Sequence, residues 1–468
     1  MRMSSNWLPT IVERSETGPF MRESDFDMAL ARRTAELVRH YGIVCDRQHV
    51  VPTDDGLAER VYQAGLDLFV DMGVYNQSTE RRILFSRQEV VDAIAAAPAR
   101  VEVGCGRETA VMHHLDVEGT TRAVVHSGPT GTPCSELAHP LILESCALEP
   151  LVDCLGAGSV STYRGKPVVP GSPNEIMAAR RDAAVAREAL RRAGRPGMHI
   201  NDVAVPLNCA GKMAACDEEN GLRSTDAFLV TQLPELKTNY DQLARVAFLL
   251  GRGMHVVDLQ TPLLDGLAGG PEGTAVATVA AHILGAVCYH ASYHIFGQMS
   301  LRWSHSSDRL GLWVSAAAGQ ALARHTPMVS AATAYTRAGL CTEEVLWETA
   351  AVSLVTMVCG LHQLGVGATG GSRADHTSGL EARFNAEVVH ACRGLRRDSA
   401  NDLALEMLSH YEANAASPDP GKPFLEIYNL DTLEPAAEWL DIYGKVRSAV
   451  RDLGLDLDRG WKEVRSGR

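Results

Sequence analysis

Asn201 and Asp202 are polar residues in a position that could support chemistry. They follow the short segment 198–200, which comes after a long helical pattern that begins with a capping box at Ser172 and ends at Gly194. A strand that ends in polar residues is typical of the carboxyl-terminal rim of a (β/α)8 barrel, where such barrels carry out their chemistry. An Asx turn that merely closes the strand is the alternative interpretation.

A second candidate site lies between residues 282 and 294, where His282, Cys288, His290 and His294 gather. In a helix, His290 and His294 would share one face, a geometry that can bind Zn²⁺, and zinc could activate a thiol or alcohol leaving group. The aromatic residues among them favour a strand or a turn instead, and the sequence places no third ligand. We therefore predict structural or supporting roles for these histidines and no metal site.

Short apolar segments alternate with longer amphipathic stretches from about residue 122 onward. This alternation predicts an α/β fold, a (β/α)8 TIM barrel with extra helices at its amino- and carboxyl-terminal ends. The sixth and eighth segments fit the strand pattern least well. The segments are 123–125, 155–157, 198–200, 228–230, 255–257, 293–295, 328–330 and 366–368. We divide the chain accordingly into an N-terminal helical elaboration (1–118), the barrel (119–400) and a C-terminal helical extension (401–468).

The composition excludes several classes of protein. The chain has 468 residues and is 46% hydrophobic, so it can bury a large core. Its 44 basic and 57 acidic residues give a net charge of −13, which argues against nucleic acid and membrane surfaces as partners. The apolar stretch 275–288 is shorter than the ~20 residues that span a bilayer, and no signal-peptide segment precedes it. The 11 cysteines are isolated, as in reduced proteins, and we expect a cytoplasmic location.

Motifs spread along nearly the whole chain resemble those of the monomethylamine:corrinoid methyltransferase family. They are 128–133 (GPTGTP), 164–167 (RGKP), 232–237 (QLPELK), 268–270 (AGG), 302–303 (RW), 341–343 (CTE) and 379–383 (GLEAR). The resemblance implies a barrel whose mouth receives a methylamine and a corrinoid protein, whose reduced cobalt takes the methyl group. It also implies that the corrinoid (cobalamin) is carried by the partner, that this chain holds no tightly bound cofactor of its own, and that it forms a homo-oligomer.

The site departs from the family pattern at several positions. A segment of the chain resembles the one in which family members carry pyrrolysine, but this sequence has Asn201 there. Its amide can only donate and accept hydrogen bonds, so it cannot form the adduct with an amine that the resemblance implies for pyrrolysine. By the same resemblance, two family glutamates fall at Leu229 and Leu259 and a glutamine at Thr333, whereas Tyr335 keeps the family tyrosine. The lost carboxylates are the groups best able to hold an ammonium.

These departures predict a pyrrolysine-independent, corrinoid-dependent methyltransferase for a small methylated compound, with a quaternary N-methyl compound as the favoured donor. Such a donor already has a good neutral leaving group. Leu229 and Leu259 would contact its methyl groups, and Tyr335 would offer a cation–π face. Asn201, Thr333 or His199 would bind a polar end. The predicted catalytic residues are Asn201 and Tyr335, and the predicted substrate-binding residues are Leu229, Leu259, Thr333, His199 and Asp202.

Two other functions stay open on the sequence. One is a zinc-dependent methyltransferase that uses the histidines near residue 290 to activate a thiol or alcohol donor. The other is a non-catalytic paralogue that binds a small molecule or a corrinoid protein. Substitution of most of the family's site favours the paralogue, whereas a retained barrel with Asn201, Asp202 and Tyr335 argues against simple decay.

Overall fold

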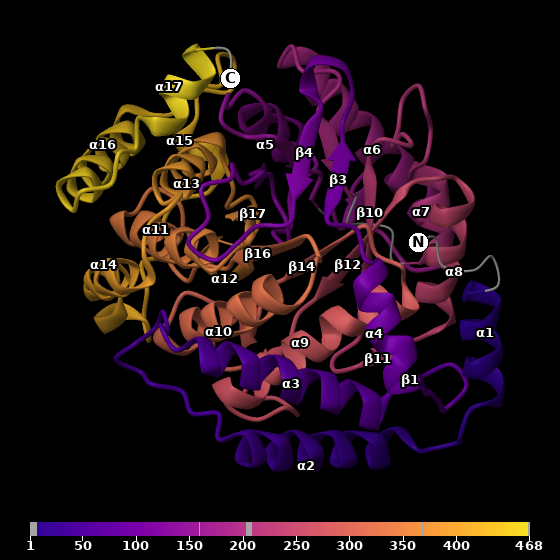
Figure 1. The fold of residues 1–468 in the computed structure, drawn as a ribbon. Coiled ribbons are helices and arrows are strands. Elements are labelled where there is room, and N and C mark those ends of the chain that lie inside the picture. Colours follow the sequence, from indigo (N-terminus) through magenta and orange to yellow (C-terminus); the bar gives the residue numbers. More distant parts are fainter. Residues whose placement is uncertain (1–6, 159, 203–207, 367–368, 467–468) are drawn as a thin grey trace.

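A closed parallel barrel lies at the centre of the molecule (Figure 1). The computed structural model describes residues 7–158, 160–202, 208–366 and 369–466. Neighbouring strands follow the order β17-β16-β14-β12-β10-β9-β6-β5, and a parallel bridge between Val125 and Gln363 joins the two ends of the sheet. The predicted (β/α)8 fold is therefore confirmed. The strands are β5 (His126–Ser127), β6 (Cys154–Gly156), β9 (His199–Asn201), β10 (Ala227–Thr231), β12 (His255–Gln260), β14 (Tyr293–Phe296), β16 (Ser330–Ala334) and β17 (His362–Val366).

Three of the predicted strand segments are displaced from the observed strands. The first, 123–125, ends just before β5; the seventh, 328–330, begins before β16; and the eighth meets β17 only at Val366. Residues 367 and 368 lie outside the described part of the chain. The first and the eighth displacements have the same cause, because β5 and β17 begin with buried polar residues, His126 and His362, which break the apolar pattern.

Helices surround the strands in the alternating order expected for this fold. They are α5 (Ala138–Ala147), α6 (Pro173–Arg192), α7 (Cys209–Ala215), α8 (Tyr240–Gly251), α9 (Pro271–Cys288), α10 (Arg309–His325), α11 (Glu343–Val358) and α13 (Gly379–Ala391). The predicted start of α6 is confirmed, but the capping box at Ser172 is not, because the Ser172 side chain caps no N–H group. Glu175 instead accepts hydrogen bonds from the backbone N–H groups of Gly171 (2.6 Å) and Asn208 (2.7 Å).

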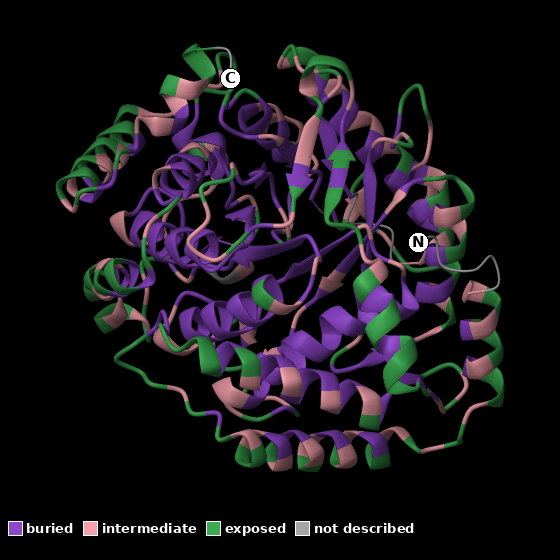
Figure 2. Cartoon of the chain, viewed as in Figure 1, coloured by how far each residue is buried: buried purple, intermediate pink, exposed green. Residues whose placement is uncertain are grey.

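The helix α9 belongs to the core of the protein. It is long and apolar enough to cross a membrane, yet 89% of its residues are buried (Figure 2). The N-terminal helix α3 (Asp55–Met72) packs on it, and Gly65 permits the contact, because a Cβ there would lie 2.6 Å from the side chain of Val279. Other N-terminal elements are α1 (Trp7–Thr17), α2 (Glu23–Tyr41) and α4 (Arg87–Ala96).

A hairpin of β3 (Arg100–Val103) and β4 (Ala110–His113) closes the N-terminal end of the barrel. Val101, Val103 and Met112 pack in the same apolar cluster as the inward-facing strand residues. The backbone around the hairpin hydrogen-bonds to residues that precede the strands, as Gly104 N–H does to the Thr225 carbonyl oxygen (3.1 Å) and Cys105 N–H to that of Gly197 (2.8 Å). The hairpin departs from the helices that the sequence predicts for this part of the chain.

Short strands lie at the C-terminal end of the barrel, and further helices follow the barrel along the chain. β7 (Thr162–Tyr163) pairs with β8 (Lys166–Pro167), β13 (Leu263–Leu264) with β15 (Met299–Ser300), and β1 (Val74–Asn76) with β11 (Lys237–Thr238) and β2 (Arg81–Ile83). The C-terminal helices are α14 (Arg397–Ser409), α15 (Phe424–Ile427), α16 (Ala437–Asp452) and α17 (Arg459–Arg465). The expected boundary at 400/401 falls inside α14, and the division into three parts stays a prediction.

Buried neutral histidines should make the protein sensitive to acid. Burial lowers the pKa of His362 and His139 to about 4 and that of His199 and His294 to about 3, against the ordinary 6.5. Below pH 6.5 the unfolded chain therefore binds protons that the folded chain does not, so the free energy of unfolding is greatest above that pH and falls as pH drops toward 4. Each such histidine contributes a slope of about 1.4 kcal/mol per pH unit in this window.

Denaturant unfolding between pH 4 and pH 8 measures this slope. His362→Gln should reduce this slope by the contribution of one histidine, because glutamine does not titrate. Its amide can still form the hydrogen bonds to Val124 N–H (2.9 Å) and to the His113 carbonyl oxygen (2.8 Å). A free energy of unfolding that stays flat from pH 7 to pH 4.5 would contradict the prediction.

Candidate functional site

His199 belongs to a polar layer inside the barrel. Its Nδ1 lies 3.0 Å from the carbonyl oxygen of Thr225, and its Nε2 lies 3.2 Å from the hydroxyl of Tyr293 on β14. Because a carbonyl oxygen can only accept, Nδ1 carries the ring proton and the Tyr293 hydroxyl donates to Nε2. Burial lowers the pKa of His199 to about 3, so the ring is neutral.

Asn201, the last residue of β9, pairs with His126 of β5. The amide nitrogen of Asn201 lies 3.4 Å from Nδ1 of His126, and both side chains are buried. Among the described residues, neither Asn201 Oδ1 nor His126 Nε2 has a hydrogen-bond partner. Burial, and to a lesser degree His199 and His362, lower the pKa of His126 well below its usual value, so this ring is neutral as well.

Leu229 and Leu259 continue the lining beside this polar layer. Asn201 is in register with Ala227, so Leu229 is the next inward-facing residue of β10 beyond that pair. Leu259 is in register with Thr231 on the neighbouring strand, two residues further along. Leu229 belongs to the barrel's apolar cluster, and half-buried Leu259 packs against it.

Tyr335 and Thr333 meet at Gly297, which directly follows β14. A Cβ on Gly297 would lie 2.5 Å from Tyr335 Cε2 and 3.1 Å from Thr333 Cβ, so the missing side chain makes room for the ring. The Tyr335 backbone is fixed by Ser306, whose Oγ accepts from Tyr335 N–H (3.1 Å) and whose N–H donates to the Tyr335 carbonyl oxygen (3.0 Å). Burial raises the pKa of Tyr335, so its hydroxyl stays protonated at neutral pH.

Asp202 turns the chain away from the end of β9. Its φ of 66° is left-handed, and its backbone bonds to both neighbouring strands, through Ala157 N–H (3.1 Å) and the Ala227 carbonyl oxygen (2.9 Å). Its carboxylate forms a buried ion pair with Lys212 of α7, whose Nζ lies 4.9 Å from the ring centroid of Phe228. The Asp202 carboxylate, for which a substrate-binding role is predicted, is therefore already paired with the Lys212 ammonium group.

The structure brings the predicted residues together in groups. His199 and Asn201 share one strand, Leu229 and Leu259 share one apolar cluster, and Thr333 and Tyr335 meet at Gly297. A single cavity surrounded by all of them stays a prediction. Three further residues of this region were not predicted from the sequence: His126, Tyr293 and Gly297. The available signal was weak: His126 directly follows a segment that was expected to be a strand.

The histidines near residue 290 face the outside of the barrel. His290 and His294 do not share a helical face, because His290 follows α9 with a φ of 51° and His294 lies in β14. His294 Nδ1 lies 3.0 Å from Asp258, and the His282 ring centroid is 5.2 Å from that of His294. Across residues 7–158, 160–202, 208–366 and 369–466, no three His, Cys, Asp or Glu side chains are grouped as metal ligands. The helical zinc geometry considered as an alternative is therefore wrong, whereas the preferred strand or turn is confirmed.

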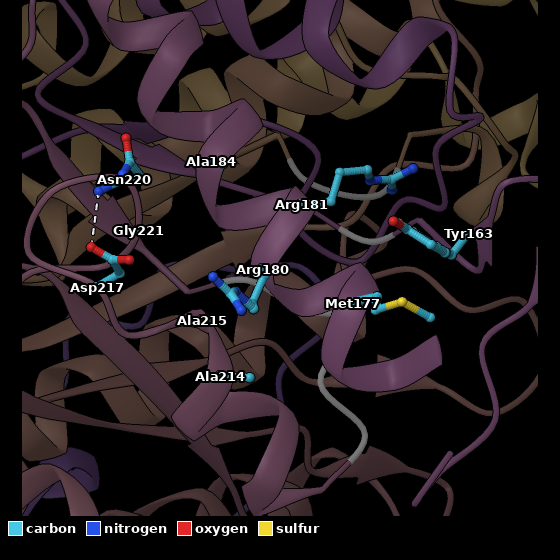
Figure 3. A pocket seen from close by; sticks show the side chains of 10 residues that line it. All are labelled: Tyr163, Met177, Arg180, Arg181, Ala184, Ala214, Ala215, Asp217, Asn220 and Gly221. Atoms are coloured by element: carbon cyan, nitrogen blue, oxygen red, sulfur yellow. Dashed lines mark hydrogen bonds between the residues drawn. The ribbon is translucent and has the colours of Figure 1, made fainter. Parts of the chain in front are cut away.

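A hollow of about 400 Å³ lies on the outer surface between α6 and α7. Figure 3 shows Asp217 and Asn220 on one side of it and Tyr163 and Arg181 on the other, with Asn220 N–H donating to the Asp217 carboxylate (3.1 Å). It is open to solvent, and none of the predicted site residues lines it. We therefore place the candidate site in the barrel.

Comparisons with known proteins show the family and the fold of the chain. A family model described as monomethylamine methyltransferase MtmB matches residues 9–455. The chain is 34% identical over 445 residues to monomethylamine methyltransferase MtmB1 of Methanosarcina acetivorans, with 95% of this chain and 97% of that protein covered. It is 33% identical to MtmB of Methanosarcina mazei with the same coverage. The crystal structure of MtmB from Methanosarcina barkeri has a TM-score of 0.93 at 31% identity, covering 97% of this chain and 100% of that chain. The crystal structure of a hydroxylamine complex of MtmB gives the same values.

Gly297→Ala should destabilise the protein by about 1–3 kcal/mol, because the added methyl group overlaps the Tyr335 ring. In the Tyr335→Ala background the same change should cost much less, so the two effects should be non-additive in denaturant unfolding. Gly444→Ala is the matched control, since no atom lies within 4 Å of a Cβ at Gly444. Additive effects of the two substitutions would show that the ring does not lie against Gly297.

Proposed function

Because the chain belongs to the monomethylamine methyltransferase family, we propose that it transfers a methyl group from a small quaternary N-methyl compound to Co(I) of a partner corrinoid protein, without pyrrolysine. Family membership makes the chain a methyltransferase, and the proposal concerns the donor and the acceptor. It includes a cytoplasmic homo-oligomer that holds no tightly bound cofactor of its own, the corrinoid being carried by the partner.

The observation that supports this donor is the uncharged lining of the barrel. The eight barrel strands contain no Lys or Arg, and Asp258 is their only acidic residue. Asp258 points outward to α9, where its carboxylate fills the space left by Gly285. The inward-facing positions of β10 and β12 include Leu229 and Leu259 and no carboxylate. A protonated amine would therefore find no counter-charge on the strands.

A quaternary donor requires no such group for the chemistry. Cobalt(I) attacks the methyl carbon, the C–N bond breaks with its electron pair remaining on nitrogen, and a neutral tertiary amine leaves. No proton has to be moved, so the protein needs only to position the methyl group and exclude water. In this proposal Leu229 and Leu259 contact the methyl groups, Tyr335 faces the cation, and Asn201, Thr333 and His199 lie at the polar end. Asp202 contributes by holding the turn after Asn201.

A donor panel tests this proposal with purified enzyme and a reduced corrinoid protein as the methyl acceptor. Methylation of cobalt, followed by its change in absorption, should be seen with a quaternary N-methyl compound and not with monomethylamine. Efficient use of monomethylamine would overturn the choice of donor. If a competent partner receives no methyl group from any donor, the chain is a non-catalytic paralogue.

Variants of the two predicted catalytic residues test how the donor is held. Tyr335→Phe keeps the aromatic face and should have a mild effect, whereas Tyr335→Ala should lower kcat/KM by about tenfold or more. Asn201→Ala should weaken binding by about 1–3 kcal/mol if the amide pairs with a buried polar end of the substrate. Equal losses in Tyr335→Phe and Tyr335→Ala would point to the hydroxyl instead of the ring.

A further inference from the structure

The polar pair Asn201 and His126 can identify the chemical class of the substrate. We infer that the polar end of the donor is an uncharged hydroxyl group, so that the donor is a quaternary ammonium alcohol of the choline type rather than a betaine with a carboxylate. This inference rests on the proposed function, because it concerns the same site. It adds His126 as a residue that determines specificity.

The first argument is the pairing of donors and acceptors. When the Asn201 amide donates to His126 Nδ1, the unpartnered atoms are an acceptor, Asn201 Oδ1, and a donor, the N–H at Nε2 of the neutral ring, and the second amide N–H is a further donor. If the amide is turned over, His126 Nδ1–H donates to its oxygen, and the pair leaves the two amide N–H groups as donors and Nε2 as an acceptor. Both arrangements therefore present donors and one acceptor. A hydroxyl group, which donates and accepts, can pair with either kind of atom, whereas a carboxylate can only accept and leaves the acceptor unpaired.

The second argument is the absence of a cation for a carboxylate. His126 and His199 are buried and neutral, and the barrel strands carry no Lys or Arg. Lys212, which follows on α7, is engaged by Asp202 in a buried ion pair. A carboxylate brought into this layer would lose its hydration without gaining a counter-charge, which is far more costly than burying a hydroxyl group that forms a hydrogen bond.

The third argument is the position of the polar pair relative to the apolar lining. Asn201 is in register with Ala227, so Leu229 lies diagonally next to Asn201 on the same inner face. Diagonal neighbours of this kind are about 7–8 Å apart at their Cα atoms, close enough for one small molecule to touch both. A short chain between the hydroxyl group and the nitrogen therefore suits the site.

Calorimetric titration of the full chain with three probes tests the inference without any partner protein. The probes are choline, tetramethylammonium and glycine betaine, which share the quaternary nitrogen and differ in the polar end. Choline should bind about tenfold more tightly than tetramethylammonium, because its hydroxyl group adds a hydrogen bond, and its affinity should exceed that of glycine betaine by at least about tenfold.

Three variants show whether the polar pair sets this order. Asn201→Leu and His126→Phe should each bring the ratio of choline to tetramethylammonium affinity close to one. Ser330→Ala is the matched control, because it removes a buried hydroxyl group on the outer face of β16, where Ser330 is in register with His294, and should leave the ratio unchanged. If one polar-pair variant does not fold, the other still gives the ratio.

The outcomes separate this inference from the proposed function. Tighter binding of glycine betaine, or equal binding of choline and tetramethylammonium by the unmodified protein, overturns the hydroxyl assignment and leaves the quaternary donor standing. A ratio that persists in both polar-pair variants overturns the assignment to Asn201 and His126. Binding of monomethylamine but of none of the three probes overturns the proposed function itself.

Discussion

The alternation of side chains along a closed sheet is the constraint on which this structure depends. On β12, the consecutive residues Asp258 and Leu259 face opposite ways. Asp258 enters the space left by Gly285 on α9, where Gln232 donates to it (2.7 Å) and His294 lies 3.0 Å away, whereas Leu259 faces the interior. A slip of one residue would bury a carboxylate inside the barrel and press a leucine against Gly285. The bonded carboxylate outside the barrel thus secures the register that keeps the inside uncharged.

The interior combines satisfied and unsatisfied polar groups. His199 uses both ring nitrogens, one at the Thr225 carbonyl oxygen and one at the Tyr293 hydroxyl, so it is fixed in a single tautomer. His126 and Asn201 use only part of their capacity on each other. Buried polar atoms without partners cost free energy, and a ligand that supplies the partners stabilises the folded state by mass action. The protein itself therefore fixes His199, whereas Asn201 and His126 keep hydrogen-bonding capacity that a ligand could use.

The sequence sufficed for the barrel and for the strand that carries Asn201, because short, mostly apolar segments alternate with clear helical patterns. It failed at β5, where His126 and Ser127 are polar yet buried by barrel closure. The contact between Gly297 and Tyr335 could not be foreseen, since it depends on the register of β14 against β16. The sequence did contain a signal for the β3–β4 hairpin, because charged and apolar residues alternate along Arg100–Val103. The position of the hairpin beneath the barrel, however, depends on tertiary contacts. The roles proposed for the site residues come from the family resemblance. The structure adds the residues that contact them.

The hairpin beneath the barrel has a consequence for the order of events during turnover. Val101, Val103 and Met112 fill the N-terminal end of the barrel, which leaves the C-terminal end as the route to its interior. Substrate, leaving amine and the cobalt of a carrier protein would all have to use that route. Under the proposed function, a docked carrier would block this end, so the donor would have to bind before the carrier arrives and the amine would leave only after the carrier has dissociated. The residence time of the carrier, rather than bond cleavage, would then limit the cycle.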